Sequence, residues 1–347
     1  MMAAAVLSAS AIASAPVHAG PQYAASLSGA EAMWELPPEQ PPHALMLLAH
    51  GCSHAGTDFW PPTSSCPKAL GLPEEVRIVQ AALAAGYAVL AITSSDRSTG
   101  CWDFTTDGPL VRDALTAWYT ATGLRTLPLV AFGASSGGAF VLQLPALLPC
   151  AAVVSQIMAL PPSMLPPPQP PILFVHMPRD QRTASFVQKC LKRLHQNGST
   201  AQQIEVHPKR PTADFFAERI ARLAPGTAAA LHGALRRAGL LDTDGFLQND
   251  PRRTAWREAI GASPGLRDSL PGPSPGTTDS LRADESAVAE ALNVAWAAHE
   301  IASDPMEATL KWLSRVVANQ TGGAERGSNS SPGRASKMVE LSNELRR

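Results

Sequence analysis

The segment Leu127–Phe140, LPLVAFGASSGGAF, constrains the fold of this chain more than any other stretch. An apolar run typical of a buried strand ends in GASSGG, and a helix-forming run follows at once. A strand that turns directly into a helix through G-x-S-x-G presents its serine on a sharp, strained turn. Gly133 and Gly137 supply the small residues that such a turn needs on either side. The pattern predicts Ser135 as a nucleophile, with the amide of Ser136 aimed at a bound oxyanion.

Two other interpretations of this segment remain open on the sequence alone. GASSGG can be an ordinary glycine-serine loop between two buried elements, since G-x-S-x-G also occurs by chance in long chains. The frame can also shift by one residue, which makes Ser136 the nucleophile but puts Ala134 at the position two before it. The strand–turn–helix context favours Ser135.

Up to about residue 210, short apolar runs alternate with segments of helical periodicity. Besides the strand before Gly133, the expected strands are His43–Ala49, Tyr87–Thr93, Ala151–Met158, Pro171–Met177 and Gln203–Val206. The expected helices are Glu74–Ala85, Pro109–Thr120, Ala139–Leu148 and Ala184–Gln196. Near-continuously apolar strands that alternate with helices predict an α/β protein, with a mostly parallel sheet covered by helices on both faces.

The pattern changes at Pro211, beyond which helices are expected without strands. The candidates are Thr212–Leu223, Thr227–Ala238, Thr254–Ile260 and Glu285–His299. Asp304-Pro305 then predicts the start of a last helix that ends near Val317. We therefore expect a core of residues 40–210 and 295–318, a helical insert at 211–294 with a mobile linker at 261–283, and a disordered tail at 322–347.

The N-terminal segment Met1–Ala19 is small and apolar and ends in VHA before Gly20. This is typical of a secretory signal segment, although the basic region that usually precedes one is missing. Beyond it, no apolar run reaches the roughly 18 residues of a membrane span. We expect the secretory pathway or the extracellular space in preference to the cytoplasm or a plastid, and no stable membrane insertion of the mature chain.

Charge and cysteine usage narrow the classes of partner. The 347 residues carry a net charge of −1 without a block of Lys and Arg, so nucleic acid is not an expected partner. The five cysteines form no C-x-x-C pair and no metal-binding spacing, so no metal site is expected. Cys52, Cys66 and Cys101 fall in loops at one edge of the predicted sheet. A Cys66–Cys101 or Cys52–Cys66 disulfide is one expectation, and three free thiols are the other.

Two features complement the predicted nucleophile. His50-Gly51 follows the first apolar strand, and the amide after Gly51, on Cys52 or Ser53, is the expected second oxyanion donor. Asp180 directly follows the strand PILFVHM, so that it comes after Ser135 in chain order. There it would fix the tautomer of a catalytic imidazole and stabilise the imidazolium. The alternative for Asp180 is an N-cap of the next helix.

Two histidines compete for the role of general base. His299 precedes the last helix, and His207 follows the short strand QIEV. The predicted helical insert lies between them, so a base can be expected either before the insert, at His207, or after it, at His299. The stretch His207-Pro208-Lys209-Arg210-Pro211 indicates an extended exit from the sheet. We therefore favour His299 and keep His207 as the alternative.

Together these motifs resemble the α/β-hydrolase superfamily. The matching pieces are LMLLAHG, YAVLAIT, LVAFGASSGG, PILFVHMPRD and HEIASDPMEATLKWL, in that order. HGCSHAGTDFWP, GLPEE, CW, GASSGG and HMPRD in combination resemble a plant and green-algal branch of the superfamily. The resemblance implies an α/β-hydrolase fold, a Ser–Asp–His triad, hydrolase chemistry and no cofactor.

The expected reaction is hydrolysis of an ester, thioester or amide through an acyl-enzyme on Ser135. The expected substrate is a small acyl compound with an apolar part, because four aromatic residues lie in the two loops Cys52–Leu72 and Ser94–Phe104. These are Phe59, Trp60, Trp102 and Phe104; they can equally pack in the core. The alternatives are a serine peptidase or acyltransferase of the same fold, and a non-catalytic ligand-binding protein.

Overall fold

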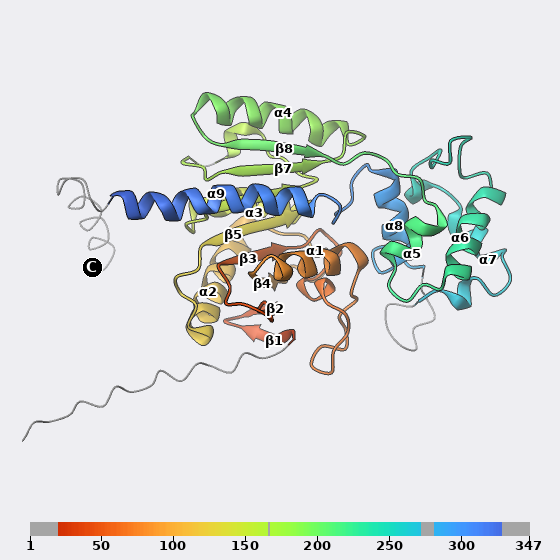
Figure 1. The fold of residues 1–347 in the computed structure, drawn as a ribbon, viewed down its shortest axis with the longest axis horizontal. Helices are drawn as coiled ribbons and strands as arrows, with labels where there is room; N and C mark the ends of the chain where they lie inside the picture. The colour runs from red at the N-terminus through yellow and green to blue at the C-terminus, as the bar shows by residue number, and fades with distance from the viewer. Residues whose placement is uncertain (1–19, 166, 272–280, 328–347) are drawn as a thin grey trace, which may run out of the picture.

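The computed structural model describes residues 20–165, 167–271 and 281–327. It contains an eight-stranded sheet with the strand order β1-β2-β4-β3-β5-β6-β7-β8 (Figure 1). The strands are β1 Gln22–Leu27, β2 Ala30–Glu35, β3 Ala44–Ala49, β4 Tyr87–Ile92, β5 Leu129–Ala134, β6 Ala152–Gln156, β7 Ile172–His176 and β8 Ala201–Glu205. Strand β2 is antiparallel to both of its neighbours, and β3 to β8 are mutually parallel. The predicted mostly parallel sheet is confirmed.

The hairpin of β1 and β2 was not expected from the sequence, which placed the start of the core at residue 40. Its loop consists of Ser28 and Gly29, between the paired residues Leu27 and Ala30. Both loop residues have positive φ, 49° and 93°, as a two-residue hairpin turn of the primed type requires. The Ser-Gly pair between two short runs was the signal in the sequence.

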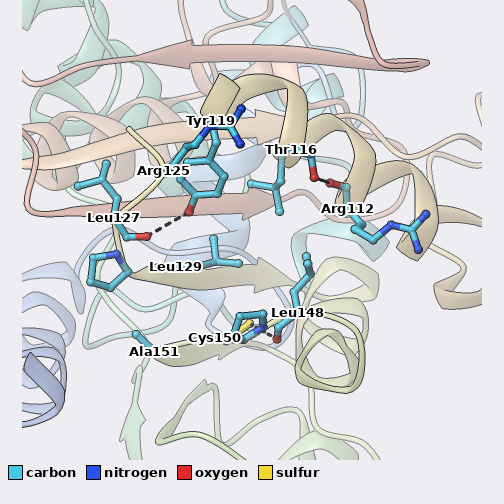
Figure 2. Close-up of a pocket in the computed structure, with 12 residues that line it drawn as sticks. Arg112, Thr116, Tyr119, Arg125, Leu127, Leu129, Leu148, Cys150 and Ala151 are labelled. Carbon is cyan, nitrogen blue, oxygen red and sulfur yellow. Dashed lines mark hydrogen bonds between the residues drawn. The ribbon is translucent and has the colours of Figure 1, made fainter. Parts of the chain in front are cut away.

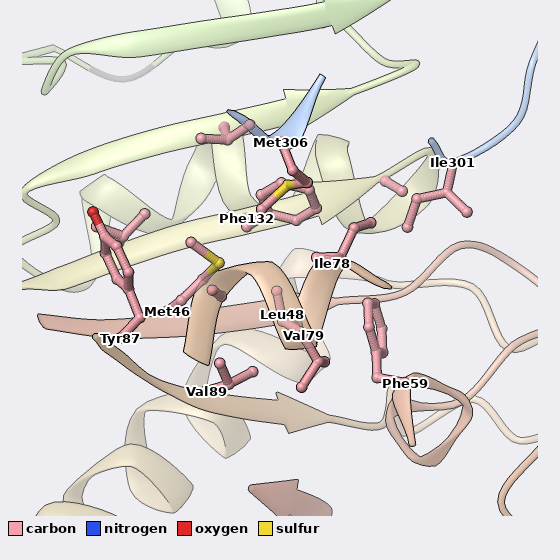
Figure 3. Close-up of a cluster of buried hydrophobic side chains, with 14 of the residues drawn as sticks. Met46, Leu48, Phe59, Ile78, Val79, Tyr87, Val89, Phe132, Ile301 and Met306 are labelled. Carbon is pink, nitrogen blue, oxygen red and sulfur yellow. The ribbon is translucent and has the colours of Figure 1, made fainter. Parts of the chain in front are cut away.

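One face of the sheet packs against α1 (Pro73–Ala84) and α9 (Met306–Gly327). Figure 3 shows Ile78 of α1 and Met306 of α9 near Phe132 of β5, with Val79 of α1 on the side of Leu48 and Val89. The alternate residues of the strands point to the opposite face, as the period of two requires. There they pack against α2 (Phe104–Thr122), α3 (Ser136–Gln143) and α4 (Gln181–Gln196).

Helix α2 begins five residues before its expected start at Pro109. Asp103 caps it by accepting a hydrogen bond from the amide of Thr106 at 2.9 Å. Pro109 is the sixth residue of this 19-residue helix, and its missing N–H removes only one intrahelical hydrogen bond. Pro109 therefore lies inside the helix instead of opening it.

The segment after Pro211 contains α5 (Ala213–Arg219), α6 (Pro225–Arg237), α7 (Trp256–Gly261) and α8 (Ala287–Trp296). Their apolar side chains form a separate buried cluster that includes Phe216, Leu231 and Leu292. Leu266, Leu270 and Leu281 of the predicted mobile linker are buried in this cluster, and residues 272–280 lie outside the described part of the chain. Figure 1 shows these four helices grouped together at one side of the sheet, at the right of the view.

The last helix is longer than the sequence indicated. Helix α9 continues to Gly327, ten residues past the expected end near Val317, although each glycine of Gly322-Gly323 disfavours a helix by about 1 kcal/mol relative to alanine. Residues 328–347 of the predicted tail and the predicted signal segment 1–19 lie outside the described residues. Over the described ranges, every helix is too short or too polar to span a membrane.

Candidate active site

The turn from β5 into α3 has the geometry of a nucleophile elbow. Ser135 adopts φ 52° and ψ −118°, a conformation that costs a non-glycine residue of order 1–3 kcal/mol. A side chain at Gly133 would overlap the backbone of Gly137, and one at Gly137 would overlap the carbonyl groups of Ala49 and His50. The two glycines are therefore required by close packing of the backbone, which explains the small residues at these positions.

The structure joins Ser135, His299 and Asp180 in one chain of hydrogen bonds. Ser135 Oγ lies 3.0 Å from His299 Nε2, and His299 Nδ1 lies 2.7 Å from Asp180 Oδ2. Ser135 stands at the end of β5, Asp180 stands just beyond β7, and His299 comes from the connection between α8 and α9. The sheet brings Ser135 and Asp180 together, because the carboxyl ends of parallel strands lie on the same side of a sheet.

Asp180 makes the contacts of both alternatives that the sequence left open, the helix cap and the partner of a histidine. Its Oδ1 accepts a hydrogen bond from the amide of Thr183 at 3.0 Å and so caps α4, while Oδ2 faces His299. Burial alone would raise the pKa of Asp180, but the hydrogen bonds from His299 and Thr183 outweigh it and lower the pKa to about 2. The carboxylate is therefore ionised at neutral pH and can accept from an imidazolium.

His207 lies elsewhere in the fold. Its side chain is 68% exposed, and its Nε2 lies 3.5 Å from Glu205 Oε2 at the end of β8. The nearby Lys209 amide donates to the carbonyl of Ala295, so the chain leaves the sheet here toward α8. Of the two predicted candidates for the base, the structure brings only His299 to Ser135.

The loop after β3 lies against the candidate nucleophile. A Cβ atom placed on Gly51 would be 3.7 Å from Ser135 Cβ. The amide of Ser53 is already bonded to the carbonyl of Thr99 at 2.7 Å, so of the two predicted candidates for the second oxyanion donor Cys52 is the better placed. Ser136 is the first residue of α3, so its amide has no acceptor within the helix.

His50 fixes the orientation of this loop. Its Nε2 accepts from the amide of Ser94 at 3.0 Å, so the proton resides on Nδ1 and donates to the carbonyl of Gly51 at 2.7 Å. Burial lowers the pKa of His50 to about 4, so the ring stays neutral and the tautomer is set. In a planar trans peptide the N–H points opposite to the C=O. Holding the Gly51 carbonyl therefore sets the direction of the Cys52 N–H.

Gln156 joins Ser135 to the loop that carries His299, through its backbone on one side and its side chain on the other. The Gln156 carbonyl accepts from the amide of Ser135 at 3.0 Å. Its fully buried side-chain amide binds both the N–H and the carbonyl of Ala302, each at 3.0 Å. The sequence carried no signal for this contact, since a glutamine at a strand end has many uses.

Comparisons with known proteins give structural likeness only. No family model matches the chain, and no curated protein matches its sequence. Among solved structures, a dienelactone hydrolase from Anabaena variabilis ATCC 29413 is similar, with 21% identity and a TM-score of 0.39 over 55% of this chain and 87% of that chain. A sugar hydrolase from Lactococcus lactis has 12% identity and a TM-score of 0.42 over 58% and 88% of the two chains.

A third similar structure is an α/β serine hydrolase without a lid from Xanthomonas campestris. It has 18% identity and a TM-score of 0.36 over 52% of this chain and 79% of that chain. At these values nothing that those proteins bind or catalyse carries over. The sheet order and the elbow at Ser135 decide the fold instead. The chain has an α/β-hydrolase fold.

In this α/β-hydrolase fold, the disulfide differs from both predicted pairs. Cys52 is bonded to Cys101, with their Cα atoms 4.2 Å apart. Cys66 is free and buried in the core with Phe59 and Trp60. Cys66 instead belongs to the buried core cluster on the α1 face of the sheet, and its side chain is 1% exposed. The disulfide thus ties the candidate oxyanion loop to the loop after β4.

Loss of this disulfide is expected to affect stability and rate together. The bond spans 49 residues, and removing a crosslink over such a loop costs about 2–4 kcal/mol of unfolding free energy. Cys101→Ser should also lower kcat by roughly tenfold, since one oxyanion donor is worth about 10² to 10³ and the loosened loop would misplace it only partly. Urea unfolding and esterase rates, with Cys150→Ser as control, measure both effects. Equal stability and rate for Cys101→Ser would contradict the expectation.

For Phe59, Trp60, Trp102 and Phe104 the sequence left a substrate pocket and core packing equally open, and the structure shows packing contacts for three of them. Phe59 and Trp60 are buried in the core, and Trp60 Nε1 donates to Glu35 Oε2 at 2.8 Å. Trp102 stacks on Phe140 with the ring centres 4.4 Å apart and donates from Nε1 to the carbonyl of His50 at 3.0 Å. Trp102 therefore supports the candidate oxyanion loop from behind.

A hollow of about 470 Å³ lies at the amino ends of β5 and β6, opposite the strand ends that carry Ser135 and Asp180 (Figure 2). It is lined by residues of α2 and of the amino end of β5, among them Tyr119, Leu127, Leu129 and Cys150. Ser135 follows the other end of β5, about 20 Å away at ~3.3 Å per residue. Burial raises the pKa of the Cys150 thiol to about 12, so this thiol is protonated at neutral pH. The hollow is therefore separate from the candidate active site.

Proposed function

We propose that this chain is a serine hydrolase that cleaves carboxylic esters of small molecules through an acyl-enzyme. The observation that carries the proposal is the hydrogen-bonded chain from Ser135 Oγ through His299 to Asp180, with distances of 3.0 and 2.7 Å. These distances are those at which a base can take the proton of a nucleophile and be oriented by a third group. The strained backbone of Ser135 supports the same role, because strain at such a residue is typical of active sites.

The reaction would begin with attack of Ser135 Oγ on the ester carbonyl carbon. His299 Nε2 takes the hydroxyl proton, and the ionised Asp180 stabilises the imidazolium through Nδ1. Collapse of the tetrahedral intermediate breaks the bond to the leaving alcohol, which receives the proton from Nε2. Water then attacks the acyl-enzyme with His299 again as base, and it releases the acid and the free Ser135 hydroxyl.

The negative charge on the intermediate would be held by two backbone amides. The Ser136 amide is free at the start of α3, and the Cys52 amide lies on the loop that contacts Ser135. Neutral His50 holds this loop in place through the Gly51 carbonyl. Fixed amides of this kind stabilise an oxyanion without reorganisation during the reaction.

The convergence of the three side chains favours an enzyme over a non-catalytic binding protein of the same fold. A binding protein does not need its serine, histidine and aspartate within hydrogen-bond distance of one another. Peptide or thioester cleavage and acyl transfer to an alcohol would use the same acyl-enzyme. Turnover rates on a panel of substrates distinguish these reactions from ester hydrolysis.

Covalent labelling tests the proposal directly. A fluorophosphonate probe should react with the purified protein, and peptide mass spectrometry should place the adduct on Ser135. A panel of p-nitrophenyl esters of increasing acyl length, beside anilide and thioester analogues, should show turnover of the esters. A protein that folds but takes up no probe and hydrolyses no ester would refute the proposed function.

A further inference from the structure

The loop that carries His299 is held from two sides. On one side, Gln156 of β6 binds Ala302, and Glu74 Oε2 of α1 accepts from the amide and the hydroxyl of Ser303 at 2.6 and 2.7 Å. These contacts begin three residues beyond His299. On the other side, the contacts come from the helical insert, and they reach His299 itself.

Arg252 of the insert makes these contacts. Its Nη2 donates to the backbone carbonyl of His299 at 2.5 Å and to Glu300 Oε2 at 3.0 Å. Asn293 Nδ2 donates to the same carboxylate oxygen at 2.8 Å, and Glu300 Oε1 accepts from the amide of Ile301 at 3.2 Å. The guanidinium therefore bridges the base and its neighbour with charge-assisted hydrogen bonds.

The turn that carries Arg252 is itself fixed. Asp250 Oδ1 accepts from the Arg252 amide at 3.0 Å and caps the short 3₁₀ turn Pro251–Arg253. Its Oδ1 also lies 3.8 Å from Arg252 Nη1. Asp250 thus helps to orient the guanidinium that contacts the His299 loop.

His299 needs such support because packing holds it only in part. Its side chain is 41% exposed, so its position depends on hydrogen bonds more than on surrounding side chains. The two ring nitrogens are bonded to Ser135 and Asp180. The backbone is bonded through its carbonyl to Arg252, which restricts rotation of the His299–Glu300 peptide.

We infer that Arg252 is a positioning residue through which the helical insert holds the general base against Ser135. This inference rests on the function proposed above. It assigns to residues 211–294 a part in catalysis, because the insert completes the support of the His299 loop that Gln156 of β6 and Glu74 of α1 begin. A misplaced base lowers the rate of the chemical step and leaves binding of a small substrate nearly unchanged.

The test compares Arg252→Gln with Arg253→Gln, the next residue on the same turn, which is exposed as Arg252 is. For Arg252→Gln, kcat on p-nitrophenyl acetate and the rate of fluorophosphonate labelling should both fall about tenfold, with KM within about twofold of wild type. Arg253→Gln should match wild type in all three values. Arg252→Lys keeps the charge beside Glu300 but lacks the planar fork, so its rates should lie between those of Arg252→Gln and wild type.

Thermal unfolding of each variant separates positioning from folding. If Arg252→Gln unfolds, Arg252→Lys alone decides, by a loss in labelling rate at unchanged KM and Tm. Equal labelling rates for wild type and the folded Arg252 variants would overturn the inference and leave the proposed function standing. A wild-type protein that takes up no probe would remove the proposed function, and this inference with it.

Discussion

Replacing Ser135 by alanine is expected to lower kcat/KM for an ester by about 10⁵ to 10⁶ and to abolish fluorophosphonate labelling. Removing the nucleophile of a triad costs about as much as removing the whole triad, because the three groups act as a unit. Some rate above that in water should remain, since the amides of Ser136 and Cys52 are backbone groups that the substitution leaves in place. Initial rates at several substrate concentrations and probe uptake on a gel measure the two effects.

The same substitution should leave the stability almost unchanged. Alanine keeps the strain of the positive φ at this position, and the loss of one half-buried hydrogen bond to His299 costs about 1 kcal/mol or less. Ser136→Ala is the matched control. The Ser136 hydroxyl is buried and has no hydrogen-bond partner among the residues that the structure describes, and its proposed role needs only the amide. Loss of labelling in Ser136→Ala but not in Ser135→Ala would move the nucleophile by one residue.

The sequence predicted those parts of the fold that depend on local pattern. The apolar runs of β3 to β7 are buried on both faces and therefore stand out without an alignment. The edge hairpin β1–β2 is partly exposed and mixes polar with apolar residues, so only its Ser-Gly turn gave a signal. The length of α9 escaped prediction because its last residues have no strong helical pattern.

The parts of the site that depend on long-range contacts were out of reach. Which two of three cysteines pair is decided by how the loops fold over one another, and the buried position of Cys66 follows from packing in the core cluster. Gln156 and Arg252 lie 143 and 47 residues before His299, and neither stands in a recognisable motif. Ser135 and Asp180 could be proposed because each directly follows a strand, where the edge of a parallel sheet gathers functional residues.

The second large expected effect is a loss of kcat on substitution of His299, which also distinguishes it from His207. His299→Ala should lower kcat by about 10⁴ to 10⁶ and slow labelling to a similar degree, because Ser135 would lose the base that takes its proton. His207→Ala should retain wild-type rates, because its side chain is largely exposed and contacts Glu205 at the end of β8. Both variants should fold, since His299 is itself 41% exposed.

Stopped-assay rates with p-nitrophenyl acetate, beside Tm values for each variant, decide between the two residues. If His207→Ala loses activity and His299→Ala keeps it, the geometry of the hydrogen-bonded chain has no bearing on the reaction. If His299→Ala alone is inactive, the base reaches Ser135 from beyond the helical insert. The connection from α8 to α9, which the insert holds through Arg252, is then the part of the chain on which the rate depends. The small separation of 3.0 Å between Ser135 Oγ and His299 Nε2 makes the second outcome the expected one.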